Sequence, residues 1–406
     1  MGKIKIFNDP VYGLIHIPSE FIFKVIEHPY FQRLRRIKQL GLTDLVYPGA
    51  NHTRFHHTIG AVHLMGLALD NLKLKGVEIS DNEYEAAQLA ILLHDIGHGP
   101  FSHALENKLV EQTSHEEISL AFMQFFNAKY EGRFAKAISI FKGDYEKPFL
   151  CELVSGQLDV DRLDYLRRDS FYTGVSEGII GADRIIKMMN VKDGHLVIEE
   201  KGIYSIEKFI IARNLMYWQV YLHKTVLCAE ILLTKIIERA KELASNSAIQ
   251  IAHGLMGKLL SSGNHEFKSI EGLDLFARID DIDTLAAIKA WCSHTDPILS
   301  ELSQMLINRQ LPKVELHNQP IEPLYIQKIE DAAKAQLGID NKELSYYIFK
   351  GSISNTMYHS TQHGIKILYK DGSLLDFTEA CKQYDLNVLN RQVQKHYICY
   401  PKSLRL

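Results

Sequence analysis

The sequence predicts a mainly α-helical protein with a small β-hairpin and a C-terminal α+β unit. Apolar residues recur with helical spacing along much of the chain, most clearly over residues 51–73 and 206–243. Two Ser-x-x-Glu sequences, at residues 80–83 and 114–117, are typical of capping boxes and mark helix starts. An Asp-Gly pair between short apolar stretches predicts a β-hairpin over residues 190–199.

The region before residue 50 is predicted to be an extended arm followed by a basic helix. Residues 1–16 form a short extended stretch that contains Asn8-Asp9-Pro10, a turn signal. Residues 31–40, FQRLRRIKQL, have apolar residues at helical spacing and predict a basic amphipathic helix. We expect Arg33 and Arg36 to lie on its solvated face, with phosphate binding as the alternative for this group of charges.

The composition indicates an ordinary globular protein and disfavours several kinds of partner. Of 406 residues, 46% are hydrophobic and 23% are charged, and the formal net charge is −3. Such a charge gives no overall positive field that would recruit nucleic acid or anionic lipid. No apolar run approaches the ~20 residues of a membrane span, and no signal peptide is recognisable. The five scattered cysteines fit a reduced compartment, so we expect a cytoplasmic protein without membrane contacts and without strong nucleic-acid binding.

The stretch LAILLHDIGHGPFSH, residues 89–103, predicts a buried helix that ends in two polar side chains. Five apolar residues precede His94 and Asp95, and glycines follow at positions 97 and 99. Burying polar groups costs several kcal/mol unless they are paired or bind a metal. Adjacent residues on a helix point about 100° apart, so His94 and Asp95 converge on one ion only where the helix ends. The alternative is a helix C-terminus with a histidine near the helix dipole.

Two histidines and two aspartates in separate predicted helices form a candidate metal site: His57, His94, Asp95 and Asp161. Imidazole and carboxylate ligands suit a divalent cation such as Mn, Fe, Mg or Zn, and no thiolate is offered. Four protein ligands leave open positions on a five- or six-coordinate ion, as metal-assisted hydrolysis requires. Candidates for proton transfer are His98, His103, Glu106 and His115. Candidates for anion binding are Arg54, Arg162, Arg168 and Arg213.

Together, the candidate metal ligands, histidines and arginines indicate a phosphate ester or anhydride as the substrate. Asp161 and Tyr165 are four residues apart, so they share one face of a predicted helix. Asp164 and Arg168 have the same spacing, and we expect them to form an ion pair at the surface.

Six segments resemble one known family, in order and at similar separations: FQRLRRIKQLG, PGANHTRFHHTIG, LLHDIGHGPFSHALE, SHEE, DVDRLDYLRRD and RNLMYWQVYLHK. They resemble the deoxynucleoside triphosphate triphosphohydrolases related to the mammalian SAM-and-HD-domain enzyme, within the HD-domain phosphohydrolase superfamily. The resemblance covers roughly residues 5–240 and does not include a SAM domain. It implies an HD-domain helical core built around the His…His-Asp…Asp pattern.

The resemblance implies a role for each matching position. It implies metal ligation by His57, His94, Asp95 and Asp161, and catalysis by His98, Glu106 and His115. It implies substrate binding by Gln39, Leu40, Arg54, His103, Arg162, Tyr165, Asp169, Arg213 and Tyr221. It implies a site for an activator nucleotide at Lys5, Gln32 and Arg35. Trp218-Gln219 departs from the family, because the mammalian enzyme has a basic pair there.

The resemblance also implies an activity. We expect a metal-dependent homo-oligomer, a dimer or tetramer, that hydrolyses dNTPs to deoxynucleoside and inorganic triphosphate and that binds an activator nucleotide. One alternative is an HD phosphohydrolase that acts on nucleotide monophosphates or phosphodiesters. Another is a nucleotide-sensing or single-stranded nucleic-acid-binding module.

Four segments are predicted along the chain. They are an N-terminal arm and basic helix (1–45), the HD catalytic core (46–250), a helical extension (251–335) and a small α+β C-terminal unit (336–406). Within the last segment, residues 346–349 and 365–369 predict strands, because aromatic and β-branched residues are frequent there. Asp371-Gly372 predicts the turn that follows.

Overall fold

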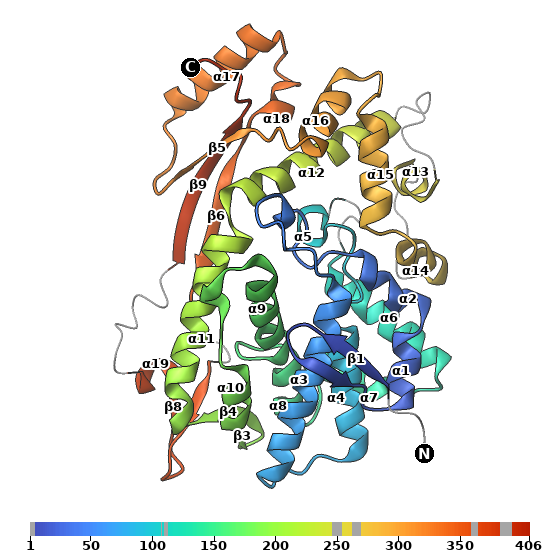
Figure 1. Ribbon diagram of the computed structural model, residues 1–406, viewed down its shortest axis with the longest axis vertical. Helices are drawn as coiled ribbons and strands as arrows, with labels where there is room; N and C mark the ends of the chain where they lie inside the picture. Colours follow the sequence, from blue (N-terminus) through green and yellow to red (C-terminus); the bar gives the residue numbers. More distant parts are fainter. Residues whose placement is uncertain are drawn as a thin grey trace.

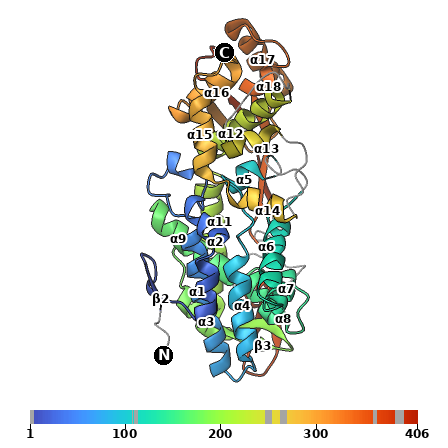
Figure 2. The same ribbon diagram turned by 90° about the vertical axis from the view of Figure 1, so that its right-hand side faces the viewer.

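The computed structural model describes residues 5–106, 108, 113–245, 254–261, 269–358, 364–381 and 392–406. The chain is mainly helical, with three small sheets. Figures 1 and 2 show an elongated molecule, with α3, α4 and β3 near one end and α16, α17 and α18 near the other. A large core of buried apolar side chains extends through most of the described elements, and a smaller cluster lies under α17.

Helices dominate the first half of the chain. The elements are β1 (Ile6–Asp9), β2 (Gly13–His16), α1 (Glu20–Ile26), α2 (Pro29–Gln32), the 3-10 turns η1 (Arg33–Arg36) and η2 (Thr43–Leu45), α3 (Arg54–Leu74), α4 (Asp81–Leu93), α5 (Ser102–Leu105), α6 (His115–Lys129), α7 (Ala135–Lys142), α8 (Pro148–Val154), α9 (Val160–Thr173), η3 (Ser176–Gly178) and α10 (Ala182–Met188). The helix α3 packs against both α4 and α9, and these three helices place the candidate metal site.

The second half of the chain mixes helices with strands. The elements are β3 (Met189–Lys192), β4 (His195–Glu199), η4 (Glu200–Gly202), α11 (Ile203–Met216), the π-helical turn η5 (Tyr217–Tyr221), α12 (Lys224–Ala244), α13 (Gly254–Ser261), α14 (Ile270–Ala277), α15 (Asp281–Trp291), α16 (Pro297–Ile307), β5 (Lys313–His317), α17 (Pro323–Leu337), α18 (Leu344–Tyr347), β6 (Phe349–Thr356), β7 (Lys366–Leu368), β8 (Leu374–Asp376), α19 (Phe377–Ala380) and β9 (Gln392–Tyr400). None of the helices that the structure describes has both the length and the apolar character of a membrane-spanning segment.

Both predicted capping boxes are confirmed. The Ser80 hydroxyl accepts a bond of 3.3 Å from the Glu83 backbone N–H, and the Glu83 carboxylate accepts one of 2.8 Å from the Ser80 N–H. Ser114 and Glu117 make the same reciprocal pair at the start of α6. Because these bonds satisfy N–H groups that have no partner within the helix, they fix where α4 and α6 begin.

The basic amphipathic helix predicted for residues 31–40 is wrong. The chain makes one helical turn (α2), then the 3-10 turn η1, and Lys38 pairs with Thr53 in an isolated β-bridge. Arg33 is fully buried rather than solvated, because its guanidinium donates to the backbone carbonyls of Ile279 at 3.2 Å, Ile96 and His98. Those three acceptors compensate its loss of hydration, so Arg33 joins α14–α15 to the turn after α4.

Strands from distant parts of the sequence pair with one another. The predicted hairpin at residues 190–199 is confirmed as β3–β4, but β4 also pairs in parallel with β7, so that the sheet order is β3-β4-β7-β8. The last strand, β9, lies between β5 and β6. The four-segment division stays a prediction, and both of these sheets contain strands from either side of its boundaries.

The predicted C-terminal strands are partly correct. Residues 365–369 contain β7, and Gly372 makes the expected turn with a positive φ of 85°. Tyr346 and Tyr347 instead belong to α18, and β6 begins only at Phe349. The run of aromatic and β-branched residues that predicted a strand thus begins three residues before the strand itself.

Candidate metal centre and its cavity

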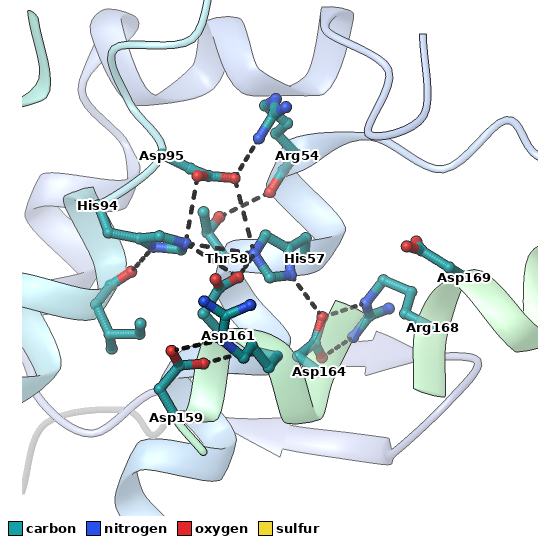
Figure 3. Close-up of polar contacts among 12 residues, drawn as sticks. Arg54, His57, Thr58, His94, Asp95, Asp159, Asp161, Asp164, Arg168 and Asp169 are labelled. Atoms are coloured by element: carbon teal, nitrogen blue, oxygen red, sulfur yellow. Dashed lines mark hydrogen bonds and ion pairs between the residues drawn. The ribbon is translucent and has the colours of Figure 1, made fainter. Parts of the chain in front are cut away.

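Three helices bring together His57 from α3, Asp161 from α9 and His94 at the end of α4 (Figure 3). The Nε2 atom of His57 lies 3.0 Å from Oδ1 of Asp161 and 3.4 Å from Nε2 of His94. One ligand atom from each of the three side chains lies within 4.8 Å of the others. Such a spacing allows a single cation to contact all three.

Asp95 lies at the edge of this group. The helix α4 ends at Leu93, and the change of direction lets His94 and Asp95 face each other, with Nε2 and Oδ1 3.3 Å apart. Asp95 Oδ2 lies 3.7 Å from Nε2 of His57 and accepts a hydrogen bond from Arg54. The structure therefore places all four predicted metal ligands together, with Asp95 shared between this group and an arginine.

A chain of buried charges lies behind His57. Its Nδ1 donates to Asp164 Oδ2 at 2.8 Å, and the Asp164 carboxylate accepts two bonds from Arg168, at 2.9 and 3.0 Å. Arg168 also donates to Asp9 at 2.7 Å. The predicted surface location of the Asp164–Arg168 pair is wrong, because both side chains are fully buried. The pair instead orients His57, as carboxylates behind metal-ligating histidines do.

Both imidazoles present Nε2 to the centre of the group. The carbonyl oxygen of Ile91 can only accept, so Nδ1 of His94 is the donor in their 2.6 Å contact. The ionised carboxylate of Asp164 likewise only accepts, so Nδ1 of His57 is the donor in their contact. Two Nε2 atoms and the carboxylates of Asp95 and Asp161 make a nitrogen-and-oxygen donor set that fits a divalent cation.

Opposite charges at this group shift the ionisation of its members. Burial raises the pKa of Asp161, but hydrogen bonds from His57 and His94 outweigh that effect and hold the pKa well below its usual range. Burial lowers the pKa of His57, but Asp161 and Asp164 together raise it to about 10. His57 thus keeps a proton between two carboxylates, and a cation that binds here displaces that proton.

The predicted catalytic trio is also brought together. The rings of His98 and His115 are stacked, with centroids 3.9 Å apart and planes 18° apart. Nδ1 of His115 lies 2.6 Å from Oε1 of Glu106. Burial and the guanidinium of Arg54 lower the pKa of His98, which keeps this imidazole neutral. Nε2 of His98 lies 3.3 Å from Asp95, so the trio adjoins the metal group.

A cavity of about 560 Å³ opens from the metal group. Its lining includes these predicted substrate-binding residues: Gln39, Leu40, Arg54, Arg162, Tyr165, Asp169 and Tyr221. Arg213 lies instead beside an adjoining cavity of about 410 Å³, which shares Arg162 and Tyr217 with the first. The guanidinium of Arg213 donates to the carbonyl of Met357, so the C-terminal part of the chain holds this arginine in place.

Each carboxylate oxygen of Asp169 has a partner within the protein. One oxygen lies 2.7 Å from Nε2 of His52, and the other accepts a 2.8 Å bond from the Tyr221 hydroxyl. The rings of Tyr221 and Tyr165 meet edge to face, with centroids 6.0 Å apart. Asp169 therefore orients one of two tyrosines that line the cavity.

The remaining predicted site residues lie elsewhere. Gln32 accepts a 2.8 Å bond from Arg35, whose guanidinium lies over the ring of Phe55. Lys5 lies over the ring of Phe23. The side chain of His103 is outside the described part of the chain.

Sequence reasoning missed two residues of this region. Asp164 was assigned to the surface, although its position three residues after Asp161 places it on the same side of α9. Glu230, which lines the cavity from α12, was not singled out. Its signal is a single acidic residue within the apolar run VLCAEILL.

Comparisons with known proteins agree with this geometry. The HD domain family matches residues 54–168, and the HD associated region matches residues 180–254. A phosphohydrolase from Bacteroides thetaiotaomicron has a crystal structure with a TM-score of 0.94 and 50% identity, covering 98% of this chain and 100% of that one. The uncharacterized protein YwfO of Bacillus subtilis is 33% identical, covering 100% of this chain and 94% of that protein.

A further relative has a named activity. The deoxynucleoside triphosphate triphosphohydrolase SAMHD1 homolog of Dictyostelium discoideum is 30% identical, over 68% of this chain and 60% of that protein. The helical fold and the His-Asp site define a phosphohydrolase of the HD class. The chain belongs to the HD-domain phosphohydrolases, so it is an enzyme, as the sequence predicted.

Proposed function

We propose that this enzyme hydrolyses dNTPs to deoxynucleosides and inorganic triphosphate, using a divalent cation held by His57, His94, Asp95 and Asp161. The observation that carries this proposal is the cavity that joins the His-Asp group to two arginines and a tyrosine pair. The activity named for the Dictyostelium relative supports the substrate class. A bound cation supplies Lewis acidity toward a phosphoryl oxygen.

Arginines provide the positive charge that a triphosphate needs. Arg54 and Arg162 line the cavity, and Arg213 lines the adjoining cavity, which shares Arg162 with the first. Guanidinium groups bind phosphate oxygens through paired N–H donors, which fixes orientation as well as charge. We propose that these three side chains bind the triphosphate and that electrostatic stabilisation accounts for most of the rate acceleration.

His115 is our choice for the residue that moves a proton. In the reaction, water adds to the α-phosphorus and the bond from that phosphorus to O5′ breaks. Water loses one proton and O5′ gains one, so a single imidazole can serve the transfer. Glu106 holds Nδ1 of His115, and the neutral ring of His98 is stacked on its face. We propose Glu106 and His98 as positioning residues for this histidine.

The cavity also presents side chains that suit a sugar. Its lining includes Tyr165, Tyr221 and Asp169, and also Gln39 and Leu40. A tyrosine packed against C2′ leaves no room for a 2′-hydroxyl, which would favour deoxyribose over ribose. We propose these five residues, together with His103, as the sugar-side contacts.

Product analysis tests the proposal directly. The purified protein is incubated with each common dNTP and NTP, and with monophosphate and phosphodiester substrates, in the presence of Mg²⁺ or Mn²⁺. We expect deoxynucleoside and inorganic triphosphate in equal amounts, with ribonucleotides reacting more slowly. Orthophosphate from monophosphates, or cleaved phosphodiesters without triphosphate, would contradict the proposal.

Assembly and activation stay predictions. We propose a homo-oligomer, a dimer or tetramer, with an activator nucleotide bound near Lys5, Gln32 and Arg35. Light scattering gives the mass with and without nucleotide, and each substrate is assayed alone and with a second nucleotide. A monomeric mass would contradict the proposed oligomer. A hydrolysis rate that no second nucleotide changes would contradict the proposed activation.

A further inference from the structure

Glu230 differs from the other carboxylates that line the cavity. Asp95 and Asp161 contact the two histidines, Asp169 contacts His52 and Tyr221, and Glu116 lies 3.5 Å from His115. For Glu230, neither a side-chain hydrogen bond nor an ion pair is found among the described residues. An acidic group that faces a cavity without a protein partner is free to bind water or a ligand that offers hydrogen-bond donors.

The position of Glu230 is set by α12 and by the loop after Leu40. One carboxylate oxygen lies 3.6 Å from the point where a Cβ would stand at Gly41. Burial raises the pKa of the Glu230 carboxyl to about 7, and no charged group among the described residues contributes to that shift. The side chain is partly exposed and lines the cavity, and its described surroundings are poor in positive charge.

This environment determines which part of a nucleotide fits beside Glu230. A triphosphate carries several negative charges, so it is attracted to the metal group and the arginines and repelled by a carboxylate without a cationic partner. The neutral part of a nucleotide is its base. Phe101 and Leu222 line the same cavity and supply apolar surface against which a flat ring can pack.

A carboxylate recognises a particular pattern of hydrogen-bond donors. It offers two acceptor oxygens and, when ionised, no donor. Among the common bases, guanine presents two adjacent donors on one edge, the N1–H and the 2-amino group. Adenine and cytosine each place an acceptor nitrogen beside their amino group, and thymine has a single N–H between two carbonyls, so each of them faces a carboxylate with at least one repulsive contact.

We propose that Glu230 is a specificity-determining residue that binds the N1–H and 2-amino edge of guanine, so that the preferred substrate is dGTP. The inference rests on the proposed function for the identity of the nucleotide, and adds which base the cavity selects. The two donors of guanine supply the hydrogen bonds that the described residues do not give to this carboxylate.

Deoxyinosine triphosphate isolates the contact, because it differs from dGTP only in lacking the 2-amino group. We expect wild-type kcat/KM to be about 10- to 100-fold higher for dGTP than for dITP, as for a hydrogen bond to a charged group. In Glu230→Gln, one acceptor becomes a donor, and the ratio should fall to within about threefold of unity.

A matched control is available on the same helix. Glu238 lies two turns further along α12 and pairs with Lys108 and Lys235 at 2.7 and 2.9 Å. Glu238→Gln removes one acidic charge from α12 without changing the cavity, so its ratio of dGTP to dITP should equal that of wild type. A general weakening of α12 would lower kcat/KM for dGTP and for dITP alike, and the ratio of the two would stay unchanged.

The outcomes separate this inference from the proposed function. If all four dNTPs are hydrolysed with equal kcat/KM, or if Glu230→Gln retains the wild-type ratio, the Glu230 assignment is wrong and the activity stands. A preference for dATP would also overturn the assignment, since it would indicate that the Glu230 carboxyl is protonated and donates a hydrogen bond to the base. If no dNTP is hydrolysed, calorimetric binding of deoxyguanosine against deoxyinosine still decides the base preference, with tighter binding of deoxyguanosine expected in wild type alone.

Discussion

The metal group and Glu230 satisfy their acidic side chains in opposite ways. In and behind the metal group, Asp161 and Asp164 are both bonded to His57, and Asp164 also holds Arg168. Glu230, which lines the same cavity as Asp161, meets no cation and no donor from the described residues. The carboxylates beside His57 are paired by the protein itself, whereas Glu230 is left for a ligand to complete. The difference teaches that the role of a carboxylate depends on its hydrogen-bond and ionic partners, and not on burial alone.

The largest effect is expected in the metal group. His94→Ala removes one imidazole from the group, and we expect kcat/KM to fall by about 10³-fold or more, since the Lewis-acid contribution is worth several kcal/mol. Metal content measured by mass spectrometry should fall with it. His63→Ala is the control, because His63 lies on α3, as the candidate ligand His57 does, but packs against Tyr12. Full metal content and activity in His94→Ala would refute the site.

A smaller effect is expected for Asp164, which lies behind His57. Asp164→Asn keeps the shape of the side chain but removes the charge that orients His57, so metal affinity should fall by about 10- to 100-fold. Competition with a chelator measures that affinity. Glu83→Gln is the comparison, because Glu83 is a buried carboxylate on α4 that bonds Lys147 and Ser80. It should reduce thermal stability and leave metal affinity at the wild-type value.

A third change tests how closely α3 and α9 must approach. A Cβ at Gly60 would stand 2.0 Å from Asp164 Oδ1 and 2.2 Å from the Arg168 guanidinium. We expect Gly60→Ala to destabilise the protein by about 1–3 kcal/mol in urea unfolding. At Gly66, on the same helix, a Cβ meets its nearest atom at 3.4 Å, so Gly66→Ala should cost little or stabilise. Equal stability of the two variants would contradict the close packing.

The smallest effect concerns Glu230 and depends on pH. Glu230 has a pKa of about 7 in the folded protein, against a usual value of 4.5. Its stability penalty therefore develops as the pH rises from 4.5 to 7 and is complete above 7. Glu230→Gln should melt about 1–3 °C higher than wild type at pH 8 and at the same temperature near pH 4.5. A lower melting temperature at pH 8 would show that a protein cation does pair with Glu230.

Local signals in the sequence predicted much of the structure around the metal group. The glycines after Asp95 indicated where α4 stops, and the serines of both capping boxes fixed the starts of α4 and α6. These features depend on a few neighbouring residues, so one sequence is enough to find them. The gathering of His57, His94 and Asp161 required the family resemblance, because spacing alone does not place three helices in space.

Long-range contacts could not be predicted in this way. Arg33 is buried because Ile279 and Ile96 offer it carbonyl groups, and no local pattern reveals partners so far away in the chain. The same holds for the parallel pairing of β4 with β7. Asp164 was placed at the surface because its i,i+4 spacing to Arg168 is the same on a buried face and on an exposed one.

The wall beside Arg213 has a consequence for the newly synthesised chain. Ser354, Asn355, Thr356 and Gln392 line the adjoining cavity, and Met357 accepts the hydrogen bond from Arg213. A ribosome that adds about 5–20 residues per second needs on the order of 10–40 s to pass from Arg213 to the end of β9. The helices of the metal group thus leave the ribosome well before this wall exists. Folding of the HD core and completion of the second cavity are separated in time by the order of synthesis.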